Sequence, residues 1–194
     1  MSDRNPNAIV ADVDQKLLLG AQLLAVDDLV AVADGKQFRV LQLLGEGLTA
    51  EVYRARLVDG ERQVALKVLK PNLAPEFRQS FMDEADTLSL LRAAERKADD
   101  GLTLIPEVIA RPRAQDTPPV LVMELVESRS VLDLLEARGP LSEKTVLTIA
   151  DQVLRVLHLL HTELRKSYTD FQLRNIRWQE DRQQIKLIDW NHVS

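Results

Sequence analysis

The spacing of apolar residues changes along this 194-residue chain, and that change limits the folds it can adopt. Between residues 29 and 70 apolar and polar residues alternate, interrupted by Asp34-Gly35 and Asp59-Gly60. Alternation is typical of strands, and an Asp-Gly pair suits a tight hairpin turn. We therefore predict two hairpins, over residues 29–44 and 51–70.

Helical spacing follows the alternating segments. Residues 75–97 and 141–164 carry apolar residues three and four positions apart, and Ser142 is placed to cap the second helix. The predicted apolar stripes are Phe77, Phe81, Leu88 and Leu91 in the first helix, and Val146, Ile149, Val153, Leu157, Leu160 and Leu164 in the second.

Four short strands and one short helix complete the prediction. The strands fall at 103–112, at 118–127 and, as a pair, within 175–190, and the helix at 130–139. Strands mostly precede helices, which predicts an α+β fold with a small β-rich lobe joined to a helical one.

Composition excludes several classes of protein. An apolar content of 45% supports a real core, and the absence of cysteine rules out disulfides and thiolate metal sites. The three histidines lack zinc-site spacing, and no apolar run approaches the roughly 18 residues of a membrane span. A net charge of −5 argues against coating nucleic acid. We therefore expect a cytoplasmic domain with no membrane or nucleic-acid partner.

The segment LGEGLTAEVY (44–53) places two glycines around one residue between two predicted strands. Such a loop allows backbone amides to approach a phosphate without side-chain obstruction. A plain hairpin turn has the same sequence character, so both interpretations stay open.

Lys67 and Glu84 have two alternative interpretations each. Lys67 in the strand VALK is either a solvated edge lysine or the partner of a buried acid. Glu84 falls within the apolar stripe of the helix at 75–97, and a buried carboxylate is costly unless it is paired. Glu84 therefore either pairs with Lys67 or lies at the edge of the stripe and reaches water.

Asp170, Asn175 and Asp189 lie in predicted loops at strand or helix ends. Each alone suits a turn. Together they supply hard oxygen ligands for Mg²⁺ and leave one carboxylate to orient a hydroxyl.

In this order, the segments resemble a eukaryotic-like protein kinase of the serine/threonine/tyrosine type, from about Phe38 to the last residues. The resemblance implies a two-lobed fold, with an antiparallel N-lobe sheet, a helix C and a partial helical C-lobe. It divides the chain into an N-terminal extension with an extra strand (1–36), the N-lobe (37–126) and part of the C-lobe (127–194).

The resemblance also implies ATP and Mg²⁺ and gives matching residues their roles. Lys67 would hold the α- and β-phosphates and pair with Glu84, Asp170 would orient the acceptor hydroxyl, and these are the predicted catalytic residues. Asn175 and Asp189 would bind the metal. The predicted nucleotide-binding residues are Gly45, Glu46, Gly47, Val52, Ala65, Lys67, Glu124 and Val126, with Val52, the Glu124 carbonyl and the Val126 amide facing adenine.

Several positions depart from the family pattern: Ala50, Tyr168, Thr169, Gln172, Arg177, Trp190 and Asn191. Thr169 replaces the arginine that reads a phosphorylated activation loop, so control of that kind is not expected. Gln172 replaces a phosphate-contacting lysine, and Arg177 replaces an aliphatic residue beneath the adenine. The sequence Ile188-Asp189-Trp190 is similar to the metal loop of aminoglycoside and choline kinase relatives.

The resemblance implies phosphoryl transfer from ATP to a protein serine or threonine. The alternatives are a small-molecule phosphotransferase and a regulator that binds nucleotide without catalysis. An activation segment has no counterpart after Asp189, so we expect the helix at 141–164 to expose apolar surface. Three explanations compete: a fragment of a longer kinase, a minimal kinase completed by a partner or a dimer, and a non-catalytic relic.

Overall fold

The computed structural model describes residues 22–32, 34–98, 101–113, 115–190 and 193. Most of the predicted N-terminal extension and Asn191 of the predicted metal loop lie outside them. The described residues form two compact units. The first comprises those of Met1–Met82 and Val108–Leu125, and the second those of Asp83–Glu107 and Val126–Ser194.

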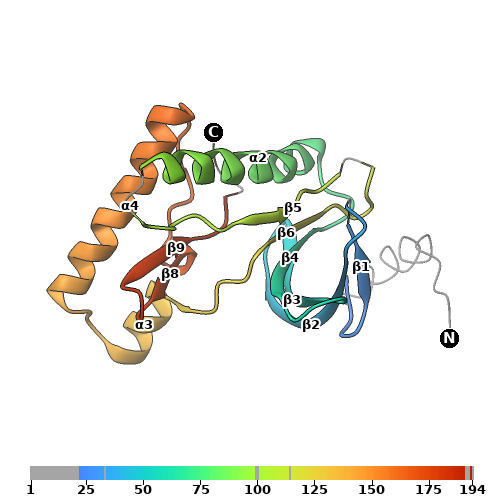
Figure 1. Cartoon of the computed structure of the whole chain (residues 1–194), viewed down its shortest axis with the longest axis horizontal. Coiled ribbons are helices and arrows are strands. Elements are labelled where there is room, and N and C mark those ends of the chain that lie inside the picture. Colours follow the sequence, from blue (N-terminus) through green and yellow to red (C-terminus); the bar gives the residue numbers. More distant parts are fainter. Residues whose placement is uncertain (1–21, 33, 99–100, 114, 191–192, 194) are drawn as a thin grey trace. The chain divides into compact units, whose positions relative to one another are not determined.

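A curled, six-stranded antiparallel sheet forms the first unit (Figure 1). Its strands, in spatial order, are β1 (Leu29–Ala31), β2 (Gln37–Glu46), β3 (Ala50–Leu57), β4 (Gln63–Leu69), β6 (Val120–Glu124) and β5 (Val108–Ala110). β1 pairs with β2, and β3 pairs with β4. Both hairpins predicted from the alternating pattern are thereby confirmed.

The core of the first unit lies within this sheet. Phe38, Tyr53 and Leu66 are almost completely buried there, and Leu23 and Leu24, which precede β1, belong to the same cluster. Burial of such side chains contributes roughly 1.5–3 kcal/mol each.

The second unit combines a three-stranded sheet with helices. The sheet has the order β7 (Arg129–Ser130), β8 (Ile176–Gln179), β9 (Gln184–Leu187), and the helices are α3 (Val131–Arg138), α4 (Glu143–Glu163) and the short 3-10 helix η1 (Leu173–Asn175). Helix α2 (Pro75–Ala98) begins in the first unit and continues in the second from Asp83. The predicted N-cap of α4 is confirmed, because the Ser142 side chain accepts a hydrogen bond from the Thr145 amide at 3.2 Å.

Two side-chain environments differ from the sequence prediction, and a third decides between two interpretations that the sequence left open. Phe77 and Val146 were expected within apolar stripes, but they are 40% and 49% exposed. Each lies in the first turns of its helix, which extend beyond the buried part of the stripe. Lys67 is not a solvated edge lysine. β4 has a strand on either side, and the Lys67 side chain is only 5% exposed.

No helix within the described part of the chain has the length and apolar content needed to cross a membrane.

Candidate functional site

The two glycines of LGEGLTAEVY lie at the turn between β2 and β3. Gly45 opposes Val52 in the antiparallel register, and the Gly47 amide donates to the Ala50 carbonyl at 2.8 Å. A Cβ atom added at Gly45 would meet nothing within 4 Å, and Leu48 at the tip is strongly exposed. The segment is a hairpin whose tip is exposed.

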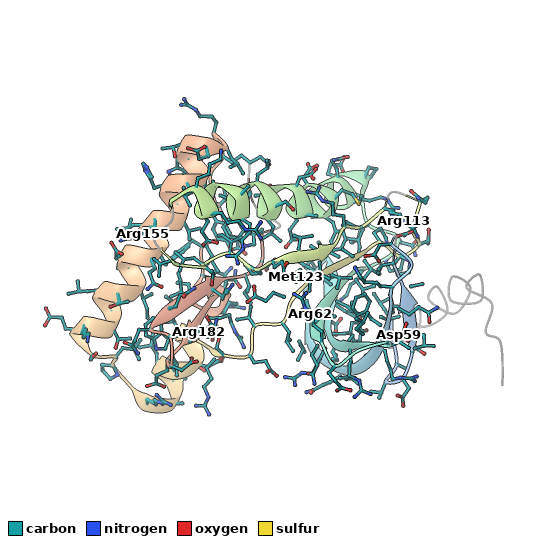
Figure 2. The ribbon with its side chains drawn as sticks, viewed as in Figure 1. Asp59, Arg62, Arg113, Met123, Arg155 and Arg182 are labelled. Carbon is teal, nitrogen blue, oxygen red and sulfur yellow. The ribbon has the colours of Figure 1, made fainter. Side chains whose placement is uncertain are left out.

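Strand pairing brings three of the predicted nucleotide residues, Val52, Ala65 and Lys67, onto one face of the sheet. Directly opposed residues on neighbouring strands share a face. Val52 opposes Lys67, and Lys67 opposes Leu121. Ala65 lies two residues before Lys67, on the same face. It opposes Met123 of β6, which is labelled in Figure 2. The face therefore combines small and apolar side chains with the buried cation of Lys67 and with the half-buried Arg54, which opposes Ala65.

The segment predicted to face the adenine, from Glu124 to Val126, spans a boundary between the units. Glu124 ends β6 in the first unit, and the boundary falls between Leu125 and Val126. Glu124 and Val126 are half-buried. Lys67 and Glu84 belong to different units, so their pairing stays a prediction.

Asp170 lies in the loop that precedes η1, and its carboxylate is held by a nearby side chain. The Gln172 amide donates a hydrogen bond to Asp170 Oδ1. This bond orients the carboxylate without bringing a positive charge to it, because a side-chain amide is neutral.

Tyr168 connects the two predicted metal ligands. Its hydroxyl donates to the Asp189 carbonyl at 2.6 Å, and it lies 3.5 Å from the Asn175 side-chain nitrogen, which donates to it. The Asn175 carbonyl also accepts a bond from the Ile188 amide at 2.9 Å. Burial, and then the charge of Asp189, raise the pKa of Tyr168 above its ordinary value, so the hydroxyl stays protonated and able to donate.

The backbone of Asp189 has a positive φ of 64°. Asp adopts this left-handed conformation more readily than most residues with a side chain, but it still needs support from its surroundings. The bond from Tyr168 to the Asp189 carbonyl supplies such support on one side. Trp190 supplies it on the other, since its ring nitrogen donates to the Leu187 carbonyl at 2.9 Å.

Glu84 is buried, with 2% of its surface exposed, so it does not lie at the edge of the stripe reaching water. Its carboxylate accepts a hydrogen bond from the Trp190 amide at 3.2 Å. The Trp190 ring packs edge-on against Tyr168, with centroids 5.2 Å apart. Glu84 therefore ties α2 to the residue that follows the predicted metal ligand Asp189.

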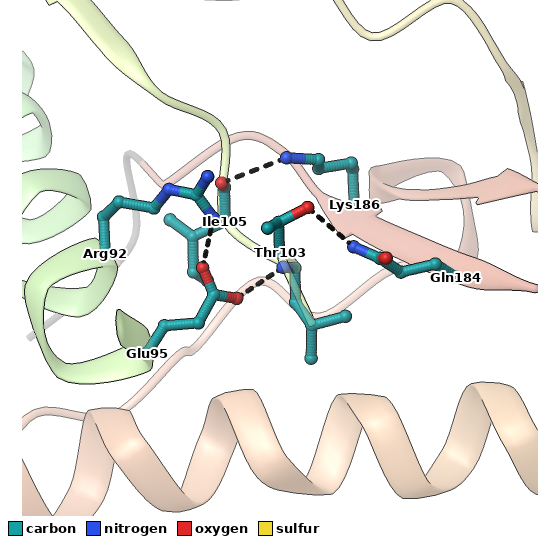
Figure 3. Close-up of polar contacts among 7 residues, drawn as sticks. Arg92, Glu95, Thr103, Ile105, Gln184 and Lys186 are labelled. Atoms are coloured by element: carbon teal, nitrogen blue, oxygen red, sulfur yellow. Dashed lines mark hydrogen bonds and ion pairs between the residues drawn. The ribbon is translucent and has the colours of Figure 1, made fainter. Parts of the chain in front are cut away.

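Segment 103–105 makes a second connection between α2 and the strand that leads to Asp189 (Figure 3). Glu95 of α2 accepts hydrogen bonds from the Leu104 amide and from Arg92. On the other side, the Leu187 amide donates to the Leu104 carbonyl at 2.9 Å. Two side chains of β9 also bond to the segment, Gln184 to Thr103 at 2.9 Å and Lys186 to the Ile105 carbonyl at 3.3 Å.

The donor set of Asn175 and Asp189 fits a magnesium ion. An amide oxygen and a carboxylate are hard ligands, and Mg²⁺ in nucleotide sites is bound by one or two such groups together with phosphates. No cluster of three or more His, Cys, Asp or Glu suited to a metal occurs among the described residues. The two side chains therefore suit a metal that arrives with a phosphate ligand.

Arg177 lies on β8, where it opposes Ser130 of β7. It is half-buried, and within the described part of the chain its Nε has no hydrogen-bond partner. Burial lowers the pKa of Arg177, although Asp133 opposes this effect. The side chain is thus partly withdrawn from water, next to the predicted site residues of η1.

From the sequence, Tyr168 was noted only as a departure from the family pattern. Its hydrogen bonds to Asn175 and Asp189 were not predicted. The nearest signal was its place two residues before Asp170. The missing information was the position of the Asp189 carbonyl, which is 21 residues away along the chain.

Comparison with known proteins identifies what the chain resembles. The family model described as protein kinase domain matches residues 38–194. A solved structure of vaccinia related kinase 3 superposes with a TM-score of 0.72 at 20% identity, over 92% of this chain and 55% of that one. At this identity the likeness concerns the fold alone, and it confirms the predicted kinase-like α+β fold.

Curated relatives are named as serine/threonine-protein kinases. PknA of Corynebacterium glutamicum is 30% identical over 129 residues, which cover 66% of this chain and 26% of that protein. The kinase ppk11 of Schizosaccharomyces pombe is 29% identical over 159 residues, 79% of this chain and 46% of its own. The kinase pkn2 of Myxococcus xanthus is 35% identical over 143 residues, which cover 72% of this chain and 15% of that protein. The chain spans less than half the length of each.

Proposed function

Because the chain belongs to the protein kinase family, we propose that it transfers the γ-phosphate of ATP to a serine or threonine hydroxyl of a protein. The observation that carries the proposal is the bonding of Tyr168 to both Asn175 and Asp189. It joins the two predicted metal ligands through one hydroxyl, two residues from Asp170. The names of the relatives support the choice of acceptor.

The first unit would bind the nucleotide. The amides of Gly45, Glu46 and Gly47 would donate to phosphate oxygens, and the Lys67 ammonium would neutralise the α- and β-phosphates. Around the adenine, the proposed residues are Val52, Ala65, the Glu124 carbonyl and the Val126 amide. Because Lys67 is buried, its charge is little screened by water, which strengthens its attraction for a phosphate.

The second unit would hold the metal and the acceptor. Asn175 Oδ1 and the Asp189 carboxylate would bind Mg²⁺, which when present offsets phosphate charge. Asp170 would accept a hydrogen bond from the acceptor hydroxyl, with its carboxylate kept in place by Gln172. Glu84 would pair with Lys67 in addition to accepting from the Trp190 amide.

The proposal is tested first by binding. Thermal unfolding of the 194-residue chain is followed with ATP, with and without Mg²⁺. A ligand at about 100 times its Kd adds roughly 2.7 kcal/mol of stability, a shift of several degrees for a chain of this size. We expect a Mg²⁺-dependent shift that is lost in Asp189→Ala and kept in Asp181→Ala, a matched change at an exposed aspartate in the β8–β9 turn.

Transfer is tested separately, with γ-phosphate-labelled ATP and casein as the acceptor. Lys67→Met and Asp170→Asn should each abolish labelling, whereas Asp170→Asn should keep the ATP-dependent thermal shift. Labelling that survives Asp170→Asn at the wild-type rate would exclude the assigned role of Asp170.

Gln172 favours one alternative, a regulator that binds nucleotide without transferring phosphate. A neutral amide stands where the family pattern places a lysine, so one positive charge is missing beside Asp170. This alternative predicts a normal Mg²⁺-dependent shift with no labelling of any acceptor, and no labelling in Gln172→Lys. Labelling by the wild-type chain would exclude it.

A further inference from the structure

The residues that precede the match to the family are an integral part of the first unit. The match begins at residue 38, yet the Asp27 amide donates to the Val40 carbonyl and the Val40 amide donates to the Asp28 carbonyl, both at 2.9 Å. β1 continues this pairing along β2, with Val30 opposite Phe38. We call residues 22–31 the N-terminal brace.

The brace is anchored to β3 by a buried carboxylate. Glu51 is only 3% exposed, and its Oε2 accepts a hydrogen bond from the Leu23 amide at 2.9 Å. The Tyr53 hydroxyl donates to the same oxygen and accepts from the Leu24 amide at 3.0 Å. A buried carboxylate is costly unless hydrogen bonds compensate it. The Leu23 amide and the Tyr53 hydroxyl supply these bonds to Glu51, and the Leu24 amide holds the Tyr53 hydroxyl in place.

Tyr53 is suited to this contact over a wide pH range. Its side chain is fully buried. Burial, followed by the neighbouring Glu51, raises the pKa of Tyr53 well above its ordinary value. The hydroxyl therefore stays protonated and can donate to Glu51 while it accepts from the brace.

The anchor lies directly beside the glycine-rich hairpin. Glu51 opposes Glu46 in the register and follows Ala50, whose carbonyl accepts the Gly47 amide and so closes the turn. Side chains alternate between the faces of a strand, so Glu51 and Tyr53 point to one face and Val52 to the other. Val52 shares its face with Lys67. The brace thus holds the hairpin from the face opposite the proposed nucleotide residues.

We propose that the N-terminal brace sets the position of the glycine-rich hairpin, and that Glu51 is the positioning residue through which it acts. The inference rests on the proposed function, because the task of the hairpin is to hold the phosphates of ATP. Glu51 itself touches no substrate in this scheme. Its effect reaches the nucleotide through the backbone of residues 45–50.

Three variants of the full chain test the inference. Glu51→Ala removes both acceptor oxygens, whereas Glu51→Gln keeps one carbonyl for the Leu23 amide and should restore part of the effect. Tyr53→Phe keeps the buried ring and removes only the hydroxyl. Glu61→Gln, a matched change at an exposed glutamate in the turn after β3, is the control.

Two readouts separate positioning from a general loss of structure. Hydrogen exchange should accelerate at least about fivefold at the amides of residues 45–50 in Glu51→Ala and Tyr53→Phe, while residues 64–68 of β4 stay as protected as in the wild type. The KM for ATP should rise about fivefold or more, with kcat within about twofold, because uniform binding of the nucleotide is weakened. Glu51→Gln should fall between Glu51→Ala and the control.

Hydrogen exchange needs no catalysis, so it tests the brace even if the chain transfers no phosphate. Unchanged exchange at residues 45–50 in Glu51→Ala and Tyr53→Phe would overturn the inference, and so would an equal increase throughout β4. If Glu51→Ala does not fold, Tyr53→Phe and Glu51→Gln decide the question. Faster exchange at the hairpin in a chain that binds no ATP would instead refute the proposed function and leave the brace as a structural support.

Discussion

At the scale of single residues, the Tyr168 hydroxyl bonds to both predicted metal ligands, the Asp189 carbonyl and the Asn175 side chain. We expect Tyr168→Phe to lower the free energy of unfolding by about 1–2 kcal/mol, because the carbonyl of the half-buried Asp189 loses a hydrogen-bond donor. The ring contact with Trp190 is kept. The measurement is urea denaturation of both proteins.

The same variant should weaken the response to Mg²⁺. Without the hydroxyl, Asn175 and Asp189 lose their common partner, so the Mg²⁺ concentration that gives half of the ATP-dependent thermal shift should rise several-fold. Asp181→Asn is the control at an exposed site. An unchanged Mg²⁺ requirement in a destabilised Tyr168→Phe protein would limit Tyr168 to a structural role.

Tyr168 also predicts a pH dependence. Its folded pKa is raised above the unfolded value of about 10. The stability that it contributes is therefore complete below about pH 10 and is lost as the pH rises through the folded pKa. We expect the free energy of unfolding of the wild type to fall more steeply above about pH 10 than that of Tyr168→Phe. Tyr53 is present in both proteins, so a difference between the two curves comes from Tyr168. Parallel curves would contradict the raised pKa of Tyr168.

At the scale of elements, α4 has one buried face and one exposed apolar face. Val156 and Leu160 are fully buried, whereas Leu147 and Leu154 are strongly exposed, with Leu154 at 65%. We expect Leu160→Ala to destabilise the chain by about 2–5 kcal/mol, because it leaves a cavity. Leu154→Ala, the same change one and a half turns earlier, should stay within about 0.5 kcal/mol. Thermal or urea unfolding measures the loss of stability in each variant. Equal losses in Leu160→Ala and Leu154→Ala would mean that both faces of α4 are covered.

Elements were predictable where their signal is local. The hairpins followed from alternation and Asp-Gly turns, and the start of α4 followed from Ser142, because both depend on neighbours in sequence. The exposed face of α4 was also expected. The burial of Lys67 was not decided by the sequence, since it depends on β6 pairing beside β4, and β6 lies more than 50 residues further along the chain.

The interior of the candidate site was predictable by residue type but not by contact. Asp170, Asn175 and Asp189 were predicted from their order along the chain. Asp170 and Asp189 lie in loops as expected, whereas Asn175 ends the 3-10 helix η1. The hydrogen bond that anchors Glu51 was not predicted, because its partner is a backbone amide 28 residues away. Every residue except proline has such an amide, so the sequence does not single one out. Glu84 was an open choice for a related reason, since its observed partner is the Trp190 amide.

At the scale of the whole molecule, the chain offers probes that report different parts. Its two tryptophans, Trp178 and Trp190, are both buried in the second unit. Tryptophan fluorescence therefore follows unfolding of the second unit, whereas far-ultraviolet circular dichroism also follows the six-stranded sheet of the first. Helix α2 passes from one unit into the other between Met82 and Asp83 without a break.

We predict that the two probes give coincident urea transitions. Independent unfolding would require α2 to break within its length, and a helix propagates cooperatively once formed. Saturating ATP with Mg²⁺ should move both transitions to higher urea by the same amount, since a ligand that binds only the native chain stabilises every part that unfolds with it. Asp189→Ala should remove this displacement from both curves. Separate midpoints, or a displacement in one probe only, would show that the units unfold independently and that the ligand stabilises one of them.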